Sequence, residues 1–203
     1  MSDESTFHLV FILLFVPGIS IAVYFRIKSE KDREKVSLEA EGMPLVIART
    51  IIGIAMMLGV LAYMINPKWM SWSSMPLPAY LRWIGAGVVA ATTPLFYWAV
   101  ASLGKNLTKT VATRRDHTLV TSGPYRWIRH PLYATVFLGW VIGVPLLTAN
   151  WFIGLTALLA FITIGIIRVR KEEAKLIERF GDKYREYMKR TGRYFPRLWG
   201  RSS

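Results

Sequence analysis

Long apolar runs alternate with short polar segments along most of this chain. Five runs are candidates for membrane-spanning helices, at residues 7–25, 44–65, 80–102, 131–149 and 151–167. A helix of roughly 17 to 25 residues crosses about 30 Å of hydrocarbon. Only Asn150 separates the last two runs, so they are expected to form an antiparallel helical hairpin. The pattern predicts an all-α integral membrane protein with about five transmembrane helices.

The composition combines a high apolar content with a strong positive charge. Of 203 residues, 53% are hydrophobic, and 26 Lys and Arg stand against 13 Asp and Glu, a net charge of +13. Such a charge could indicate a nucleic-acid partner, but the apolar runs leave little soluble surface for a duplex. The chain has no cysteine, which excludes disulfides, thiolate metal sites and thiol nucleophiles.

The basic residues predict the orientation in the membrane. Segments 26–43, 105–130 and 168–203 hold 23 of the 26 Lys and Arg. With five spans all three segments fall on one side, whereas four or six spans would break this alternation. The positive-inside rule then places them in the cytoplasm and the N-terminus outside. The start of the chain lacks the basic region of a signal peptide, so the first span is expected to be retained.

Two glycine patterns lie inside the predicted spans. Gly139 and Gly143 form a small-xxx-small pair, which predicts a close helix contact in the fourth span. Gly85, Gly87 and Ala90 superficially match a dinucleotide fingerprint. They lie inside an apolar helix with no strand before them, so they predict no nucleotide site.

The first segment with candidate chemistry reads LGKNLTKTVATRRDHTLVTSGPYRWIRHPLY, residues 103–133. The sequence Ser-Gly-Pro at 122–124 predicts a turn. Pro131 suits the first turn of the fourth helix, where its missing N–H has no cost. Arg129 and His130 are therefore expected at a helix N-terminus on the membrane boundary, where exposed N–H groups can receive an anionic or hydrogen-bonding ligand.

Each of these residues also has a purely structural interpretation. A lone interfacial histidine is more often structural, tyrosines can belong to the aromatic belt, and arginines can simply follow the positive-inside rule. The density of the cluster favours a functional site. Five such side chains fall within 17 residues: His117, Tyr125, Arg129, His130 and Tyr133.

The second segment, RVRKEEAKLIERFGDKYREYMKRTGRYFP at 168–196, predicts one continuous helix leaving the fifth span. Its apolar face comprises Leu176, Ile177, Phe180, Tyr184, Tyr187 and Met188. Taken alone, this pattern is typical of an interfacial amphipathic helix. Arg168 and Glu172 share one face at the membrane edge, and an acid at that depth is a functional candidate.

At these residues the sequence resembles the isoprenylcysteine carboxyl methyltransferase family of integral membrane methyltransferases. The resemblance is carried by HTLVTSGPYRWIRHPLY and the later EEAKLIERFGDKYREY, and it covers residues 103–196. Residues 1–102 match only in hydropathy and are expected to form three N-terminal transmembrane helices. Residues 103–203 would then be the catalytic region, composed of a cytoplasmic loop, the hairpin and the amphipathic helix.

The resemblance implies that this region binds S-adenosylmethionine from the cytoplasm. The implied cofactor-binding residues are His117, Thr118, Leu119, Val120, Tyr125, His130, Pro131, Leu132, Tyr133, Glu172 and Glu173. Arg168 and Glu172 would be the catalytic residues, and Arg168 and Arg129 would bind the acceptor. The sequence departs from the family at Thr110, where members can carry an amide side chain.

The chemistry of methyl transfer agrees with this composition. Displacement from a sulfonium requires alignment and exclusion of water, but neither a metal nor a covalent nucleophile. A carboxylate acceptor is already ionised at neutral pH, and a guanidinium holds it in a fixed fork. We therefore expect transfer of a methyl group to a lipophilic acceptor, first of all a carboxylate such as a C-terminal prenylcysteine. The expected partners are the bilayer and this acceptor, with no metal and no nucleic acid.

Two alternatives remain at this point. A sterol-type membrane reductase carries a similar arginine-histidine-proline box but uses a nicotinamide cofactor. A non-catalytic basic membrane anchor would use its C-terminal helix to bind anionic lipid. Within the methyltransferase interpretation, the residues leave the acceptor open between a prenylcysteine, another carboxylate, a thiol and a lipid amine.

Overall fold

The computed structural model describes residues 3–30, 43–104, 118–163 and 167–197, and these ranges contain helices but no β-strand. The long elements are α1 (Asp3–Glu30), α2 (Met43–Ile65), α3 (Ala79–Leu103), α6 (Trp151–Phe161), α7 (Ile167–Phe180) and α8 (Asp182–Arg190). A continuous helical segment consists of α4 (Pro131–Val136), the π-helical η5 (Phe137–Gly143) and α5 (Val144–Thr148). Two short 3-10 helices are η2 (Pro67–Ser73) and η4 (Gly123–Arg126).

Four helical segments are long and apolar enough to cross a membrane: Asp3–Phe25, Val46–Ile65, Ala79–Leu103 and Pro131–Thr148. They confirm the first four predicted spans to within a few residues at each end. The fifth predicted span appears as α6, an apolar helix of 11 residues. Part of its predicted length, 164–166, lies outside the described residues, so a full fifth crossing stays a prediction.

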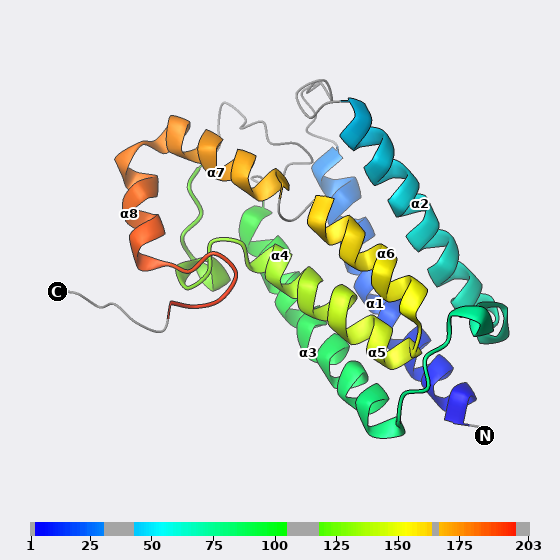
Figure 1. Cartoon of the computed structure of the whole chain (residues 1–203). Coiled ribbons are helices and arrows are strands. Elements are labelled where there is room, and N and C mark those ends of the chain that lie inside the picture. Colours follow the sequence, from blue (N-terminus) through cyan, green and yellow to red (C-terminus); the bar gives the residue numbers. More distant parts are fainter. Residues whose placement is uncertain (1–2, 31–42, 105–117, 164–166, 198–203) are drawn as a thin grey trace.

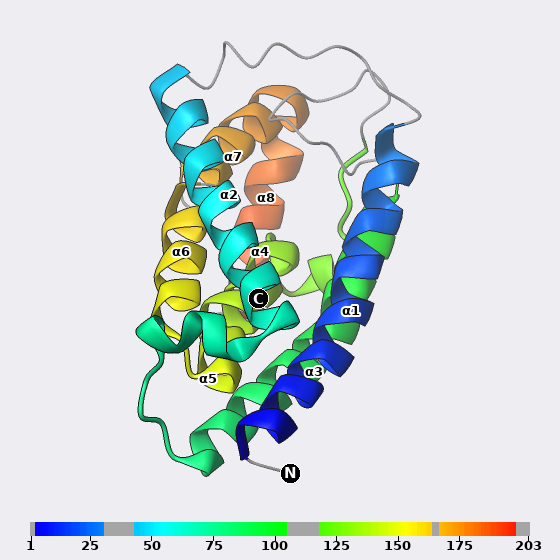
Figure 2. The ribbon, with the colours of Figure 1, turned by 90° about the vertical axis from the view of Figure 1, so that its right-hand side faces the viewer.

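The apolar helices run side by side in alternating directions (Figures 1 and 2). The N-terminus of α1, η2 and the junction of α5 with α6 lie at one end of the bundle, here named the N-terminal end. The end of α3, the start of α4 and both C-terminal helices lie at the opposite end, here named the site end. The described residues of the two segments predicted to carry chemistry, 118–133 and 168–196, therefore lie at the same end of the molecule.

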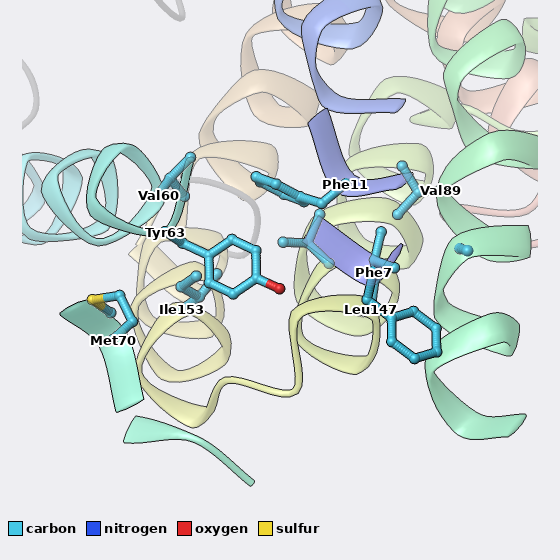
Figure 3. Close-up of a cluster of buried hydrophobic side chains, with 10 residues drawn as sticks. Phe7, Phe11, Val60, Tyr63, Met70, Val89, Leu147 and Ile153 are labelled. Atoms are coloured by element: carbon cyan, nitrogen blue, oxygen red, sulfur yellow. The ribbon is translucent and has the colours of Figure 1, made fainter. Parts of the chain in front are cut away.

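A cluster of buried apolar side chains lies near the N-terminal end of the bundle. Buried apolar side chains from α1, α2, η2, α3, α5 and α6 meet there (Figure 3): Phe7, Phe11, Val60, Tyr63, Met70, Val89, Leu147 and Ile153. Elsewhere on α1 and α2 many large apolar side chains are exposed, among them Leu13 and Ile51. Such exposure suits contact with lipid, because hydrocarbon tails are as apolar as the side chains themselves.

A buried arginine joins three helices at the N-terminal end. Arg82 of α3 is 7% exposed, and its guanidinium lies 2.7 Å from a carboxylate oxygen of Glu4 on α1. Its Nε donates to the carbonyl of Leu147 at 3.0 Å, and the group also lies over the Phe7 ring. A charge within a membrane span is costly unless it is paired. Arg82 therefore fixes α1, α3 and α5 relative to one another.

The junction between α5 and α6 is short, and the side chain of Asn150 makes three hydrogen bonds there. Asn150 accepts a hydrogen bond from the Ile153 N–H at 3.1 Å and so caps the start of α6. Its amide group also donates to Ser73 Oγ at 2.8 Å and to the Met70 carbonyl. Ala149 before it adopts a left-handed backbone, with φ of 48°. The chain thus reverses within two residues, and α6 packs along η5 in the opposite direction.

Glycines allow α3 to approach η5 and α5 very closely. A Cβ at position 85 would lie 2.5 Å from the backbone nitrogen of Leu147 and 2.7 Å from the Gly143 carbonyl oxygen. A Cβ at Gly143 or Gly139 would likewise lie 2.8 Å from a side-chain atom of α3. The predicted close contact at Gly139 and Gly143 is confirmed. Gly85, part of the apparent nucleotide fingerprint, serves the same helix contact.

The expected continuous C-terminal helix is wrong. Gly181 has φ of 54°, in the left-handed region that favours glycine, and its N–H donates to the Ile177 carbonyl at 2.8 Å. This residue ends α7, and α8 turns sharply away from it (Figure 1). Part of the predicted apolar face is still buried after this break, because Tyr184 and Tyr187 of α8 are buried.

The substitution Gly85→Ala should destabilise the fold, because the added methyl group meets backbone atoms of the facing helix. Overpacking of this kind costs about 1–3 kcal/mol. Gly87→Ala is the matched control, since nothing lies within 4 Å of its Cβ position on the same helix. Thermal unfolding in one detergent should give a lower midpoint for Gly85→Ala only. Equal midpoints for the two variants would contradict the close contact.

Candidate functional site

The loop before α4 is held against the end of α3 by a glycine. Gly123, the first residue of η4, has φ of 58°, and a Cβ there would lie 2.5 Å from Ser102 Oγ. The turn predicted at 122–124 is confirmed, and it directs residues 127–130 toward the start of α4. Pro131 occupies the first turn of α4, as predicted, with His130 directly before it.

The residues after α8 return to this loop and pair with it. We call Thr191–Tyr194 the C-terminal strap. The Arg129 N–H donates to the Gly192 carbonyl at 2.8 Å, and the His130 N–H donates to the Arg193 carbonyl at 3.0 Å. The Gly192 N–H in turn donates to the Trp127 carbonyl at 3.1 Å. Contrary to the expectation from sequence, the N–H groups of Arg129 and His130 are occupied within the protein.

Glu173 of α7 is at the centre of the site. Its side chain is 5% exposed, and Oε1 accepts hydrogen bonds from Arg129 Nε at 3.1 Å and from His130 Nε2 at 3.2 Å. Arg193 Nη2 donates to Oε2 on the other side of the carboxylate. This single group therefore connects α7, the start of α4 and the C-terminal strap.

The carboxylate of Glu173 is ionised throughout the physiological range. Burial alone would raise its pKa, but the hydrogen bonds from His130, Arg193 and Arg129 outweigh burial and lower the pKa to about 2. A depressed folded-state pKa stabilises the fold above the unfolded value of about 4.3. That contribution is lost as the pH falls from about 4.3 toward 2.

Arg129 also closes the end of α8. Its Nη1 donates to the Met188 carbonyl at 3.0 Å and to the Thr191 carbonyl, both of which lie at the C-terminal end of that helix. Cations are favoured there because the last carbonyls of a helix lack partners within it. The buried guanidinium thus holds α8 against the loop before α4 and against Glu173.

Tyrosines complete the connection between the two sequence segments. Tyr133, one turn into α4, donates its hydroxyl to Glu172 Oε1 at 3.1 Å. Tyr187 of α8 donates to the Tyr125 carbonyl at 2.6 Å. Burial raises the pKa of Tyr125, and it raises that of Tyr187 to about 12, so both phenols are neutral at physiological pH. The neutral Tyr187 hydroxyl therefore acts as a donor that holds α8 against η4.

The structure brings together most of the residues that the sequence singled out. Those within or beside the network are Tyr125, Arg129, His130, Pro131, Tyr133, Glu172 and Glu173. Thr118, Leu119 and Val120 form the lead-in to η4, with Thr118 exposed, and Leu132 is half-buried on α4. His117 lies outside the described residues. Arg168 is in the first turn of α7, one helical turn before Glu172, and its side chain is not among those described.

Sequence reasoning missed the C-terminal strap. It gave no role to Arg193, whose carbonyl and guanidinium both reach the network. Twenty residues and a helix break separate Arg193 from Glu173 in the chain, so no helical or strand spacing links the two. The one available signal was Gly192 directly after a basic amphipathic helix, which is typical of a turn.

Comparison with known proteins identifies the region that contains this site. The model described as "Isoprenylcysteine carboxyl methyltransferase (ICMT) family" matches residues 83–178, from α3 into α7. A protein-S-isoprenylcysteine O-methyltransferase from Schizosaccharomyces pombe is 35% identical over 100 residues, which are 48% of this chain and 42% of the relative. The cobalt-zinc-cadmium resistance protein CzcN of Cupriavidus metallidurans is 38% identical over 88 residues, covering 43% of this chain and 40% of that protein. The chain thus spans less than half the length of these curated relatives.

A solved structure shows the same fold over nearly the whole chain. The eukaryotic intramembrane Ras methyltransferase ICMT superposes with a TM-score of 0.54 at 21% sequence identity, covering 92% of this chain and 67% of that one. The shared fold includes the apolar helices, which agrees with an integral membrane protein. The matched residues 83–178 contain the loop before α4, the box at 129–133 and both glutamates of the network. Over these 96 of its 203 residues the chain matches the isoprenylcysteine carboxyl methyltransferase family.

Proposed function

We propose that this protein transfers a methyl group from S-adenosylmethionine to a lipophilic carboxylate at the site end of the bundle. The observation that carries this proposal is the meeting of two distant sequence segments in one network. His130 contacts Glu173, and Tyr133 contacts Glu172, across about 40 residues of intervening chain. A basic membrane anchor would require only an amphipathic face, with no buried network of this kind.

The residues present suit a cationic methyl donor. The donor would supply a sulfonium-bound methyl group. A carboxylate oxygen of the acceptor would bond to the methyl carbon as the C–S bond breaks, and the demethylated donor would leave as a neutral thioether. Carboxylates and aromatic faces both attract cations, and Glu172 with Tyr133 offers one of each on neighbouring helices. We propose that Glu172, Tyr133, Tyr125 and the lead-in residues 117–120 hold the donor. Glu173 is instead proposed to position His130 and Arg129, because its bonds are made within the protein.

Arg168 is proposed to orient the acceptor. It is the second residue of α7, seven residues after the end of the apolar helix α6 and four before Glu172, which suits a place at the membrane boundary. A guanidinium at this boundary can fix a carboxylate while its lipophilic tail remains in lipid. The name of the fungal relative favours the carboxylate of a prenylated cysteine. The metal-resistance name of the bacterial relative shows that the shared region also occurs in proteins named for other roles.

The site end is proposed to face the cytoplasm. The segments 26–43, 105–130 and 168–203 hold nearly all the Lys and Arg, and the described helices α3, α4, α7 and α8 begin or end at that side. The positive-inside rule then places the N-terminal end, with η2, outside. The donor would enter from the aqueous cytoplasm and the acceptor from the bilayer.

The proposed reaction predicts a base-labile methyl ester on a prenylated cysteine. Purified protein in nanodiscs, given labelled S-adenosylmethionine and farnesylcysteine, should form this ester, whereas the carboxamide analogue should remain unlabelled. Arg168→Ala should lower kcat/KM for the acceptor about 10- to 100-fold, the loss expected of a hydrogen bond between charged groups. Arg170→Ala, an exposed arginine on the same helix, should leave turnover unchanged.

Calorimetry on the same preparation separates the alternatives. Binding of S-adenosylmethionine or its demethylated product supports the proposal, and Arg168→Ala should retain it. Binding of a reduced nicotinamide in place of either would favour the reductase alternative. If none of these ligands binds at millimolar concentration, the protein is better explained as a membrane anchor.

The two adjacent glutamates should differ in what their removal changes. Glu172→Gln should weaken donor binding about tenfold with little change in thermal stability, since a neutral amide attracts a cation less. Glu173→Gln should instead lower the free energy of unfolding at neutral pH by about 3 kcal/mol, because a pKa depression of this size has that value. Acid titration of stability should show the loss between about pH 4.3 and 2 in wild type but not in Glu173→Gln. A Glu172→Gln variant that only destabilises the fold would remove this residue from the donor site.

The orientation can be measured because the chain has no cysteine of its own. Two variants, Ser74→Cys and Ser202→Cys, each carry a single cysteine. Intact cells that express either variant are treated with a membrane-impermeant maleimide. The Ser74→Cys protein should be labelled directly and the Ser202→Cys protein only after permeabilisation. Labelling of both from the same side would contradict an odd number of spans.

A further inference from the structure

Arg193 is connected to His130 in two ways, by a direct backbone hydrogen bond and indirectly through Glu173. The Arg193 carbonyl accepts the backbone N–H of His130 at 3.0 Å. Its guanidinium donates to both oxygens of Glu173, and Glu173 Oε1 accepts from Nε2 of the His130 ring at 3.2 Å. The main chain and the imidazole of His130 are therefore both held, directly or through Glu173, by one residue of the C-terminal strap.

Arg193 differs from its partners in exposure. The side chains of Arg129, His130 and Glu173 are between 5% and 9% exposed, whereas that of Arg193 is 42% exposed. Because the Arg193 side chain is only partly packed, its hydrogen bonds to Glu173 contribute more to holding it in place than packing does. Its hydrogen bonds to Glu173 raise the pKa of the Arg193 guanidinium, the direction expected for a cation paired with a carboxylate.

The strap is well built to present Arg193 at this place. Thr191 donates its hydroxyl to the Tyr187 carbonyl at 2.6 Å and closes the end of α8. Gly192 allows the next turn, since a Cβ there would lie 1.7 Å from the Phe195 carbonyl oxygen. The pairing of Gly192 with Trp127 and Arg129 then fixes the strap alongside the loop before α4. These contacts direct the Arg193 guanidinium toward Glu173, although the strap is neither a helix nor a strand.

We propose that Arg193 is a positioning residue for the methyl-donor site, acting through Glu173 and His130. The proposal rests on the function proposed above. It extends that site beyond the residues that the family model matches, because these end at 178. Loss of the guanidinium would leave Glu173 Oε2 without this cation and allow the carboxylate and the His130 ring to turn. The start of α4, with Tyr133 one turn away, would then hold the donor less firmly.

Steady-state methyl transfer with Arg193→Ala tests this proposal. KM for S-adenosylmethionine should rise about tenfold, because a less firmly held site would weaken binding by the equivalent of about one charge-assisted hydrogen bond to the donor. Arg193→Lys keeps a cation without the planar fork and should restore KM in part. The control is Arg185→Ala, which removes one arginine from neighbouring α8, where Arg185 pairs with the exposed Asp182. Its KM should equal that of wild type.

A purely structural role for Arg193 predicts a different result. Partial unfolding lowers the active fraction, so the maximal rate falls while KM stays the same. An unchanged KM in both Arg193 variants therefore overturns the proposal, and if the alanine protein does not fold, the lysine variant decides by the same criterion. Wild-type protein that neither binds nor uses S-adenosylmethionine would overturn the proposed function itself, and this inference with it. Active wild type with unchanged variants would overturn the inference alone.

Discussion

The site end of this protein depends on one buried, ionised carboxylate. Glu173 is surrounded by the side chains of Arg129, His130 and Arg193, which reach it from two other segments. A carboxylate buried without these donors would be protonated or would destabilise the fold. With them, it connects α7, the loop before α4 and the C-terminal strap. The position of Glu172 beside Tyr133 follows from this arrangement, because Glu172 is the preceding residue on the same helix.

The opposite end of the bundle uses the same physical principle for a different purpose. Arg82 pairs with Glu4 and the Leu147 carbonyl, and so fixes three helices beside the aromatic core. Between the two ends, contact depends on small residues such as Gly85 and Gly143 that let α3 and α5 approach. Apolar side chains gain little from mutual burial in lipid, so polar pairs and close packing determine the arrangement. The proposed chemistry is therefore placed on helices with fixed relative positions.

Much of the fold could be predicted because membrane spans need long apolar runs. The first four spans, the turn at Gly123, the start of α4 at Pro131 and the glycine contact at Gly143 all follow from local composition. The continuous C-terminal helix was wrong because the left-handed backbone of Gly181 outweighed the regular apolar spacing on both sides of it. The occupied N–H groups of Arg129 and His130 could not be predicted either, since their acceptors lie about 60 residues away in the strap.

The sequence by itself determined the membrane class, the first four candidate spans and the two segments that resemble the methyltransferase family. These properties depend on hydropathy and on neighbouring residues, which the chain displays directly. Only the tertiary structure decided how the adjacent glutamates divide their contacts, with Glu173 bound by His130 and two arginines and Glu172 bound by Tyr133. Adjacent helical residues point about 100° apart. Which of them meets a distant partner depends on packing that no local pattern contains.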